Sequence, residues 1–442
     1  MLFVAATAAK VGGVESWTDR AVERLPSLGF DPVVALVHGQ QTHDAYAYRE
    51  HHPDLPSIVV DGRGLGRDSR VRAVQRAIGR TKPAFVVPLG VYDAFLAAAR
   101  LKQTDASAPR LVARTQSNFP EMMADLADLQ PAVDVAICNG RMAKTLLTTR
   151  LGYDPARVRY VPNGCDAPTH SRPPRSPDAP LRLLFAGRLS PSDKRCGDLV
   201  PLVAALHRRE VRFTLDVVGD GPARAELDAA FASDPVVTLH GRQPHAALYE
   251  RFYPQADALL LLSESESFGI VLPEAMQNGV VPICSEYRGF FTERIVEPER
   301  TGLTFPVGDT ERAAEQVARL QDDDDRESLA AAARKAAARY SWDRCLTDWA
   351  AALRHAETLT PQVDAVPEPA PLESGRLTRL GIGDAPQDRL RRLRRVLFGP
   401  AVPPGGEEWP FWSRRHGEAR LDELRGAMQT IDASAVQETV AA

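Results

Sequence analysis

The stretch SESESFGIVLPEAMQNG (residues 263–279) follows the apolar run 258–262, and together they decide the fold class. The apolar run is one Ala followed by four Leu, which is typical of a strand buried on both faces of a parallel sheet. A helix is expected to begin soon after Gly269, because Pro273 is tolerated in a first turn. Gly279 then ends the helix. This strand–loop–helix order is the unit of a doubly wound α/β fold.

The same order continues in both directions along the chain. Short apolar runs alternate with longer amphipathic stretches, which predicts parallel strands connected by helices. The predicted strands of a first series are residues 2–6, 33–37, 57–60, 85–89, 111–115 and 133–138, and those of a second series are 181–186, 213–218, 236–240, 258–262, 281–284 and 302–306.

A Pro-rich stretch separates the two series. Five prolines lie within residues 166–180, which indicates a linker or hinge. We therefore expect an N-terminal α/β domain over residues 1–165 and a C-terminal α/β domain over 181–357. The two domains are expected to face each other across a cleft at the carboxyl ends of both sheets. Residues 358–442 form a tail of helical and extended pieces.

Composition says little about partners. The chain has 442 residues, 44% of them apolar, and a formal net charge of −4, so no bias toward nucleic acid is indicated. The five Cys are scattered without a CxxC pair or a Cys/His cluster, which indicates neither disulfides nor zinc and favours a reducing cytoplasm. We interpret the N-terminus as a buried strand rather than a signal peptide, and no run of about 18 apolar residues predicts a membrane span.

Two carboxylates lie within residues 263–279. Glu266 follows the predicted strand, and Glu274 lies about two turns further on, where it can face the same cleft. Free N–H groups at the helix start suit a phosphate, and carboxylates suit sugar hydroxyls. The alternative is that the Glu residues only favour the helix dipole, which accounts for Glu266 better than for Glu274.

Two further loops have residues suited to phosphate. The loop AGRLSPSDK (residues 186–194) follows the first strand of the second series and carries Arg188 and Lys194, and a diphosphate requires several positive charges. Gly12 and Gly13 follow the first strand of the chain and would let the backbone approach a ligand closely. A solvated loop and a tight turn are the respective alternatives. The fingerprint GxGxxG is absent, which disfavours a nicotinamide enzyme.

Together these motifs resemble the family-four glycosyltransferases, which have the GT-B fold of two facing Rossmann-like domains. The most specific match is the spacing from Glu266 to Glu274, with Phe268-Gly269 between them. The other matching elements, in the order of the family, are Gly12-Gly13, Pro162-Asn163-Gly164, Gly187-Arg188-Leu189 with Lys194, and Val218-Gly219-Asp220-Gly221-Pro222.

The resemblance implies a retaining glycosyltransferase that uses a nucleotide-diphosphate sugar, a UDP-sugar first and a GDP-sugar second, without a metal or other cofactor. It implies front-face substitution, in which Arg188 and Lys194 stabilise the leaving phosphate. Glu266 would contact the sugar and Glu274 the ribose. The remaining residues implied at the donor are Gly12, Gly13, Gly187, Gly241, Arg242, Ser267, Phe268, Gly269 and Ile270.

The sequence departs from the family pattern at two places. The family often places a His after the fifth strand, close to the donor sugar, and Gln116 occupies that position here. Gln can hydrogen-bond but cannot carry a proton at neutral pH, which leaves the sugar specificity open. The loop that holds Lys194 is also one residue longer than usual, so Arg195 is a rival for the role of Lys194.

Several alternatives stay open. The acceptor is a lipid, a glycan, a protein or a small molecule, and the oligomeric state is open. A non-catalytic GT-B subunit that acts as a binding or chaperone partner is the alternative function, and a sugar-nucleotide epimerase is a third. The basic helix predicted within 68–82 is interpreted as a surface helix, with peripheral docking at the inner membrane face as the alternative. Trp409 and Trp412 are expected to pack onto a domain, or otherwise to bind a carbohydrate or a partner.

Overall fold

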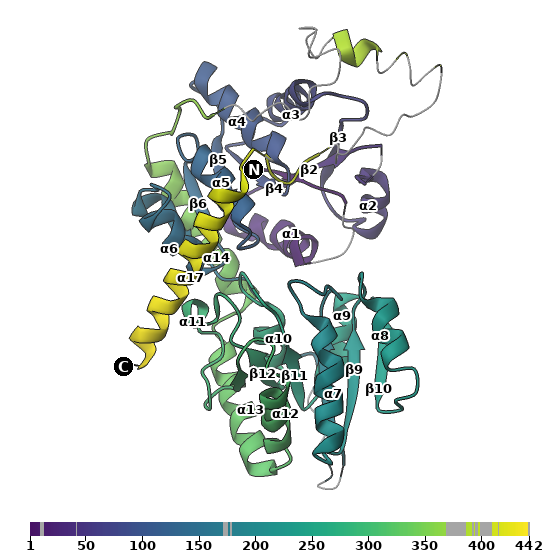
Figure 1. Cartoon of the computed structure of the whole chain (residues 1–442). Coiled ribbons are helices and arrows are strands. Elements are labelled where there is room, and N and C mark those ends of the chain that lie inside the picture. The colour runs from purple at the N-terminus through teal and green to yellow at the C-terminus, as the bar shows by residue number, and fades with distance from the viewer. Residues whose placement is uncertain are drawn as a thin grey trace. The chain divides into compact units, whose positions relative to one another are not determined.

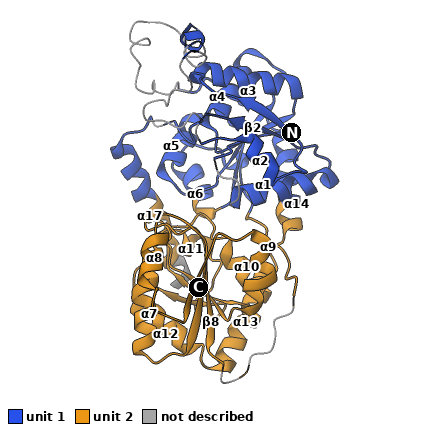
Figure 2. Ribbon diagram, turned by 90° about the vertical axis from the view of Figure 1, so that its right-hand side faces the viewer, with its two compact units in different colours: residues 1–139, 143–161, 346–427 blue, residues 140–142, 162–345, 428–442 orange. Residues whose placement is uncertain are grey.

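The computed structural model (Figure 1) describes residues 1–8, 13–40, 42–170, 176, 179–367, 386–390, 393, 397, 409–413 and 415–440. These residues form two compact units (Figure 2). The domain boundaries given above at residues 165, 181 and 357 stay a prediction. The N-terminal unit contains residues 1–139, 143–161 and 346–427, and the C-terminal unit contains residues 140–142, 162–345 and 428–442.

The N-terminal unit is built on a seven-stranded parallel sheet in the order β3-β2-β1-β4-β5-β6-β7. Its strands are β1 (Leu2–Ala5), β2 (Val33–His38), β3 (Ser57–Asp61), β4 (Phe85–Leu89), β5 (Arg110–Arg114), β6 (Val135–Cys138) and β7 (Val158–Tyr160). Its helices include α1 (Gly13–Arg24), α2 (Ala45–His51), α3 (Arg67–Thr81), α4 (Tyr92–Thr104), α5 (Pro120–Leu129) and most of α6 (Arg141–Thr149).

The C-terminal unit repeats this plan with a six-stranded parallel sheet in the order β10-β9-β8-β11-β12-β13. Its strands are β8 (Leu181–Ala186), β9 (Phe213–Val218), β10 (Val237–Gly241), β11 (Ala258–Leu261), β12 (Val281–Ser285) and β13 (Leu303–Phe305). Its helices include α7 (Leu199–Arg208), α8 (Arg224–Ala230), α9 (His245–Ala247), α10 (Val271–Gln277), α11 (Phe290–Glu293), α12 (Thr310–Arg319) and α13 (Asp323–Ala337).

The C-terminal sheet is buried on both faces, as its apolar runs predict. Successive side chains of a strand point to opposite faces. Accordingly, Leu183 and Phe185 pack in one core with residues of α7 and α12, whereas Leu184 packs in the other with residues of α10 and α13. Gly279 ends helix α10 with a φ of 70°, the left-handed conformation that favours glycine at this position.

The order of each sheet reverses next to its first strand. In the N-terminal unit the reversal lies between β1 and β4, and in the C-terminal unit it lies between β8 and β11. Doubly wound sheets bind ligands at the carboxyl ends of the strands beside such a reversal. Each unit therefore has one edge where a binding site is expected.

Helix α3 is the basic helix predicted within residues 68–82. Its apolar side chains Val71, Val74 and Ile78 are buried, so this face packs on the core and is closed to lipid. This burial confirms the interpretation of the helix as an ordinary core-facing surface helix. Peripheral contact with a membrane stays a prediction. Within the described residues, no helix is both long enough and apolar enough to cross a membrane.

The tail is divided between the units. Helix α14 (Trp342–Thr358) is followed by residues that include 409–413, and the chain ends in α17 (Glu418–Val440). Of these residues, 346–427 group with the N-terminal unit and 428–442 with the C-terminal unit. Trp409 is fully buried, which confirms the prediction that it packs onto a domain.

Candidate functional site

The loops after β8 and β11 meet at the reversal of the C-terminal sheet. The backbone N–H of Glu264 donates to the carbonyl of Asp193 at 2.9 Å, which joins the two loops. The Nζ atom of Lys194 lies 2.5 Å from Oε1 of Glu266. Ser263 also donates to this oxygen, at 2.6 Å. The structure thus brings together the predicted cation and the predicted carboxylate.

Arg188 lies in the same loop as Lys194 and is the more exposed of the two. Its side chain is 61% exposed, and its guanidinium donates to Asp193 at 2.6 Å. Burial alone would raise the pKa of Asp193, but the Ser190 hydroxyl and the cations Arg188 and Lys194 outweigh it and lower that pKa. Asp193 is therefore ionised at neutral pH and holds Arg188 at the edge of the sheet.

Arg195 is directed elsewhere. Its Nε donates to Asp198 at 2.8 Å, and its Nη1 lies 3.5 Å from Glu264. Its φ of 46° is in the left-handed region, which is uncommon for a residue with a side chain. Lys194, not its rival Arg195, is therefore the cation beside Glu266.

The glycines of the loops after β8 and β9 differ in what they permit. A Cβ on Gly219 would lie 1.8 Å from the carbonyl oxygen of Gly187, so the two loops can pack only because Gly219 lacks a side chain. At Gly187 itself, a Cβ would meet nothing closer than a Phe185 ring atom at 4.0 Å. The space in front of Gly187 is therefore open among the described atoms.

Glu274 is buried and has two partners that the sequence did not indicate. Its Oε1 lies 2.8 Å from Nε2 of His245, and its Oε2 accepts a 2.8 Å hydrogen bond from the hydroxyl of Tyr253. The side chain of His245 is 33% exposed. Because His245 lies just after β10, it joins the loop of Gly241 to helix α10. Glu274 is thus held in place at the sheet edge.

The other predicted residues of this unit lie around these loops. Phe268 is buried against Tyr340, so only its backbone can meet a ligand. Gly269 has a φ of 74° and turns the chain into helix α10, just before which Ile270 is half-buried. Ser267 precedes this turn. Gly241 ends β10, and Arg242 after it is exposed.

Two predicted residues of the N-terminal unit, Gly13 and Gln116, are described and lie at the edge of its sheet. Gly12 lies outside the described residues. Gly13 opens helix α1, and a Cβ there would have no described atom within 4 Å. Gln116 follows β5 and is half-buried, and it lines a pocket together with Arg114. Among the described residues, no group of three His, Cys, Asp or Glu side chains is placed to hold a metal ion.

Two family descriptions match adjoining parts of the chain. Residues 11–169 match the description "Glycosyltransferase Family 4", and residues 166–337 match "Glycosyl transferases group 1". Together the two matches cover more than half of the chain, and both describe glycosyltransferases. The chain belongs to the glycosyltransferases. The loops of this glycosyltransferase that hold Lys194, Glu266 and Glu274 all lie in the second matched part.

Curated relatives match parts of this glycosyltransferase. A sulfoquinovosyl transferase of Arabidopsis thaliana is 30% identical over 39% of this chain and 32% of its own length. A GDP-mannose-dependent alpha-mannosyltransferase of Mycobacterium tuberculosis is 34% identical over 38% of this chain and 41% of its own. The matches span only about a third to two fifths of the length of these relatives.

Solved structures match the fold of the glycosyltransferase more completely. Anabaena HepE, solved in complex with UDP and glucose, superimposes with a TM-score of 0.63 over 80% of this chain and 98% of its own, at 18% identity. A likeness at this identity concerns the fold alone. Together with the two parallel sheets, it confirms the predicted α/β fold of the GT-B class.

Proposed function

We propose that the protein is a retaining glycosyltransferase that transfers a sugar from a nucleotide-diphosphate sugar to an acceptor hydroxyl. The observation that supports it best is the contact between Lys194 and Glu266 at the reversal of the C-terminal sheet, with Arg188 in the same loop. Cations suit a diphosphate, and carboxylates suit the hydroxyls of sugar and ribose. Both kinds of group lie at one edge, as donor binding requires.

The donor diphosphate would lie against the open face of Gly187, between Arg188 and Lys194. The Lys194 ammonium has three donors, so it can keep its bond to Glu266 while it donates to a phosphate oxygen. Glu274, fixed by His245 and Tyr253, would accept hydrogen bonds from the ribose hydroxyls. A UDP-sugar is the first choice and a GDP-sugar the second. UDP is bound in the structure of Anabaena HepE, and the similar mannosyltransferase of Mycobacterium tuberculosis depends on GDP-mannose.

In the proposed reaction, the bond between the anomeric carbon and the β-phosphate oxygen breaks, and a bond from the acceptor oxygen to the same carbon forms on the same face. The acceptor proton passes to the departing β-phosphate. Arg188 and Lys194 stabilise the negative charge that grows on that phosphate, a role that is worth most in the transition state. The two cations supply this charge from the protein, so we propose transfer without a metal.

Nucleotide binding and donor turnover test the proposal. We expect titration calorimetry to show binding of UDP or GDP, and mass spectrometry to show slow hydrolysis of the matching sugar nucleotide. Arg188→Ala should weaken nucleotide binding about 10-fold to 100-fold, since a charge-assisted contact contributes about 1.5–3 kcal/mol. Arg195→Ala is the matched control, because Arg195 is directed to Asp198 and Glu264 rather than to Glu266, and it should change binding less than about 3-fold.

Two outcomes would contradict the proposed transferase. If the folded protein binds neither nucleotide, the non-catalytic interpretation replaces this one. If nucleotide binds but the sugar is released as its epimer, the protein is an epimerase. The nature of the acceptor, a cytoplasmic location and a peripheral contact with the inner membrane face stay predictions.

A further inference from the structure

Residues 409–413 (WPFWS) of the tail lie across the carboxyl edge of the N-terminal sheet. Trp409 is fully buried, and its Nε1 donates to the carbonyl of His38, the last residue of β2, at 3.1 Å. The carbonyl of Pro410 accepts from the backbone N–H of Tyr92, the first residue of α4, at 2.9 Å. This short segment thus contacts both the end of β2 and the start of α4.

The edge of the sheet is shaped to receive this segment. A Cβ on Gly62, just after β3, would lie 2.4 Å from the ring of Trp409, and a Cβ on Gly90, just after β4, would lie 2.7 Å from the ring of Phe411. Any other residue at either position would displace an aromatic ring. The guanidinium of Arg70 lies 5.7 Å from the centre of the Trp409 ring, within the range of a cation–π contact.

The far end of the segment is anchored by a buried carboxylate. Asp125 on helix α5 is 4% exposed. Its Oδ2 accepts from the backbone N–H of Ser413 at 2.8 Å, and its Oδ1 lies 2.9 Å from Nε2 of His416. The segment therefore runs from β2 and β3 to α5, across the reversal between β1 and β4. This is the position at which a doubly wound sheet binds its ligand.

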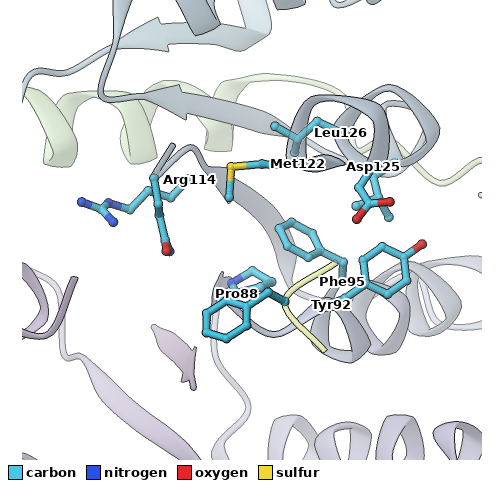
Figure 3. A pocket seen from close by; sticks show the side chains of 11 residues that line it. Pro88, Tyr92, Phe95, Arg114, Met122, Asp125 and Leu126 are labelled. Atoms are coloured by element: carbon cyan, nitrogen blue, oxygen red, sulfur yellow. The ribbon is translucent and has the colours of Figure 1, made fainter. Parts of the chain in front are cut away.

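A pocket lies beside the segment at this edge, on the side of helices α4 and α5 (Figure 3). Tyr92 and Phe95 of α4 face Met122 and Leu126 of α5 across it. Phe411 of the docked segment also lines the pocket. Gln116 adds a polar group that can hydrogen-bond a hydroxyl.

Phe411 differs from its neighbour Trp409 in one respect. Trp409 is fully buried, whereas Phe411 is 38% exposed, although both belong to one docked segment. Phe95 and Met122 in the same pocket are also only half-buried. Apolar surface that stays in contact with water inside a pocket is what an apolar ligand group covers.

We propose that this pocket is an acceptor subsite that takes an apolar ring of the acceptor, and that Phe411 is a specificity-determining residue supplied by the tail. The proposal rests on the proposed function, because only a transferase has an acceptor. The ring lies among Phe95, Met122 and Phe411, and Gln116 faces the polar part of the same molecule.

Two glucosides that differ by one ring test the proposal. Phenyl β-D-glucopyranoside and methyl β-D-glucopyranoside have the same sugar hydroxyls, and saturation-transfer NMR on the full chain measures the binding of each. We expect the phenyl compound to bind at least about fivefold more tightly, with its ring protons receiving most of the saturation. Phe411→Ala should weaken its binding about fivefold, in the range of one aromatic contact, and leave the methyl compound unchanged.

Matched variants make the result specific. Val363→Ala removes an exposed apolar side chain of the same unit and should change neither glucoside. Phe411→Leu keeps an apolar wall without a ring and should give an intermediate loss. Phe411 is partly exposed, so both variants are expected to melt near the unaltered protein. If Phe411→Ala melts well below it, Phe411→Leu decides in its place.

The proposal is overturned if the two glucosides bind alike, or if the Phe411 variants bind the phenyl compound as tightly as the unaltered protein does or more tightly. Failure of the proposed function has a different signature, because it is the absence of UDP and GDP binding, which concerns the loops of the C-terminal unit. A protein that binds nucleotide and does not distinguish the glucosides refutes the subsite alone.

Discussion

The hydroxyl of Tyr253 donates a 2.8 Å hydrogen bond to Oε2 of Glu274, while Nε2 of His245 lies 2.8 Å from the other carboxylate oxygen. Burial, followed by the negative charge of Glu274, raises the pKa of Tyr253 well above its ordinary value. Tyr253 therefore stays a protonated donor. Because both oxygens of Glu274 are held by protein groups, the orientation of this carboxylate is set before a ligand binds.

Loss of the Tyr253 hydroxyl should loosen that carboxylate. We expect Tyr253→Phe to lower the free energy of unfolding by about 1–2 kcal/mol and to weaken UDP binding about 3-fold to 10-fold, since a buried acceptor loses its partner. Calorimetry and thermal melting measure the two effects. Tyr249→Phe is the control, because the Tyr249 hydroxyl accepts from the N–H of Asp166 rather than contacting Glu274. Equal UDP affinity in both variants would show that the Tyr253 contact is not needed for binding.

Lys194 and Arg195 are adjacent cations with different partners, so their alanine variants should differ in the rate of sugar transfer. We expect Lys194→Ala to lower the rate of sugar transfer or donor hydrolysis about 100-fold to 1000-fold, the usual effect of removing one group that stabilises the transition state. Arg195→Ala should lower it less than about 3-fold. Mass spectrometry of released nucleotide measures both rates. A larger loss in Arg195→Ala would reverse the assignment of the two residues.

Gly219 and Gly187 lie against each other but should respond differently to a methyl group. Gly219 has a φ of 146°, and its Cβ would lie 1.8 Å from the Gly187 carbonyl oxygen, so Gly219→Ala should cost about 2 kcal/mol or more of stability. At Gly187 an added methyl group has no such close contact. Gly187→Ala should therefore change the free energy of unfolding by less than about 0.5 kcal/mol.

For donor binding, in contrast to stability, the substitution at Gly187 should matter. Because the open face of Gly187 is where the diphosphate is proposed to lie, Gly187→Ala should weaken UDP binding while it keeps its stability. Differential scanning fluorimetry with and without UDP separates the two effects. A Gly187→Ala protein with unchanged UDP affinity would place the diphosphate elsewhere.

His43 gives a pH dependence to the stability of the N-terminal unit. Burial lowers the pKa of His43 from 6.5 to about 4, and its Nδ1 accepts from the N–H of Thr7 at 3.2 Å. The unfolded chain therefore binds this proton more readily than the folded chain. The contribution of His43 to stability is fully present above pH 6.5 and is lost as the pH drops from there toward 4, by about 3 kcal/mol in all.

Thermal denaturation followed by circular dichroism between pH 4 and pH 7 measures this loss. His43→Asn keeps an acceptor near the position of Nδ1 and does not titrate in this range, so its stability should vary less with pH by about the same amount. If both proteins lose stability in parallel, other groups account for the acid sensitivity.

Apolar runs in the sequence predicted most strands of the two sheets, because strands buried on both faces consist almost wholly of apolar residues. The predicted strands 85–89, 181–186 and 213–218 have the bounds of β4, β8 and β9. Strand β7 was missed. It has three residues, with Arg159 at its centre, so it is too short and too polar to form an apolar run.

The site could be predicted only where residue type and spacing are distinctive. Lys194 and Glu266 belong to such patterns, and they lie in contact. His245 and Tyr253 lie in a stretch of short, irregular helical turns with no motif, and only their distance from Glu274 distinguishes them. The place where Trp409 docks depends on Gly62, a turn glycine more than 300 positions away in the sequence.

The docked segment 409–413 has a consequence for how relatives are compared. The regions by which the chain is recognised as a glycosyltransferase end at residue 337, well before Phe411. Two proteins could have the same sequence throughout those regions and still differ in the residues that line this pocket, because Phe411 comes from a separate stretch of chain. Exchange of that stretch between relatives would then be a route by which substrate choice changes during evolution while the catalytic loops stay the same.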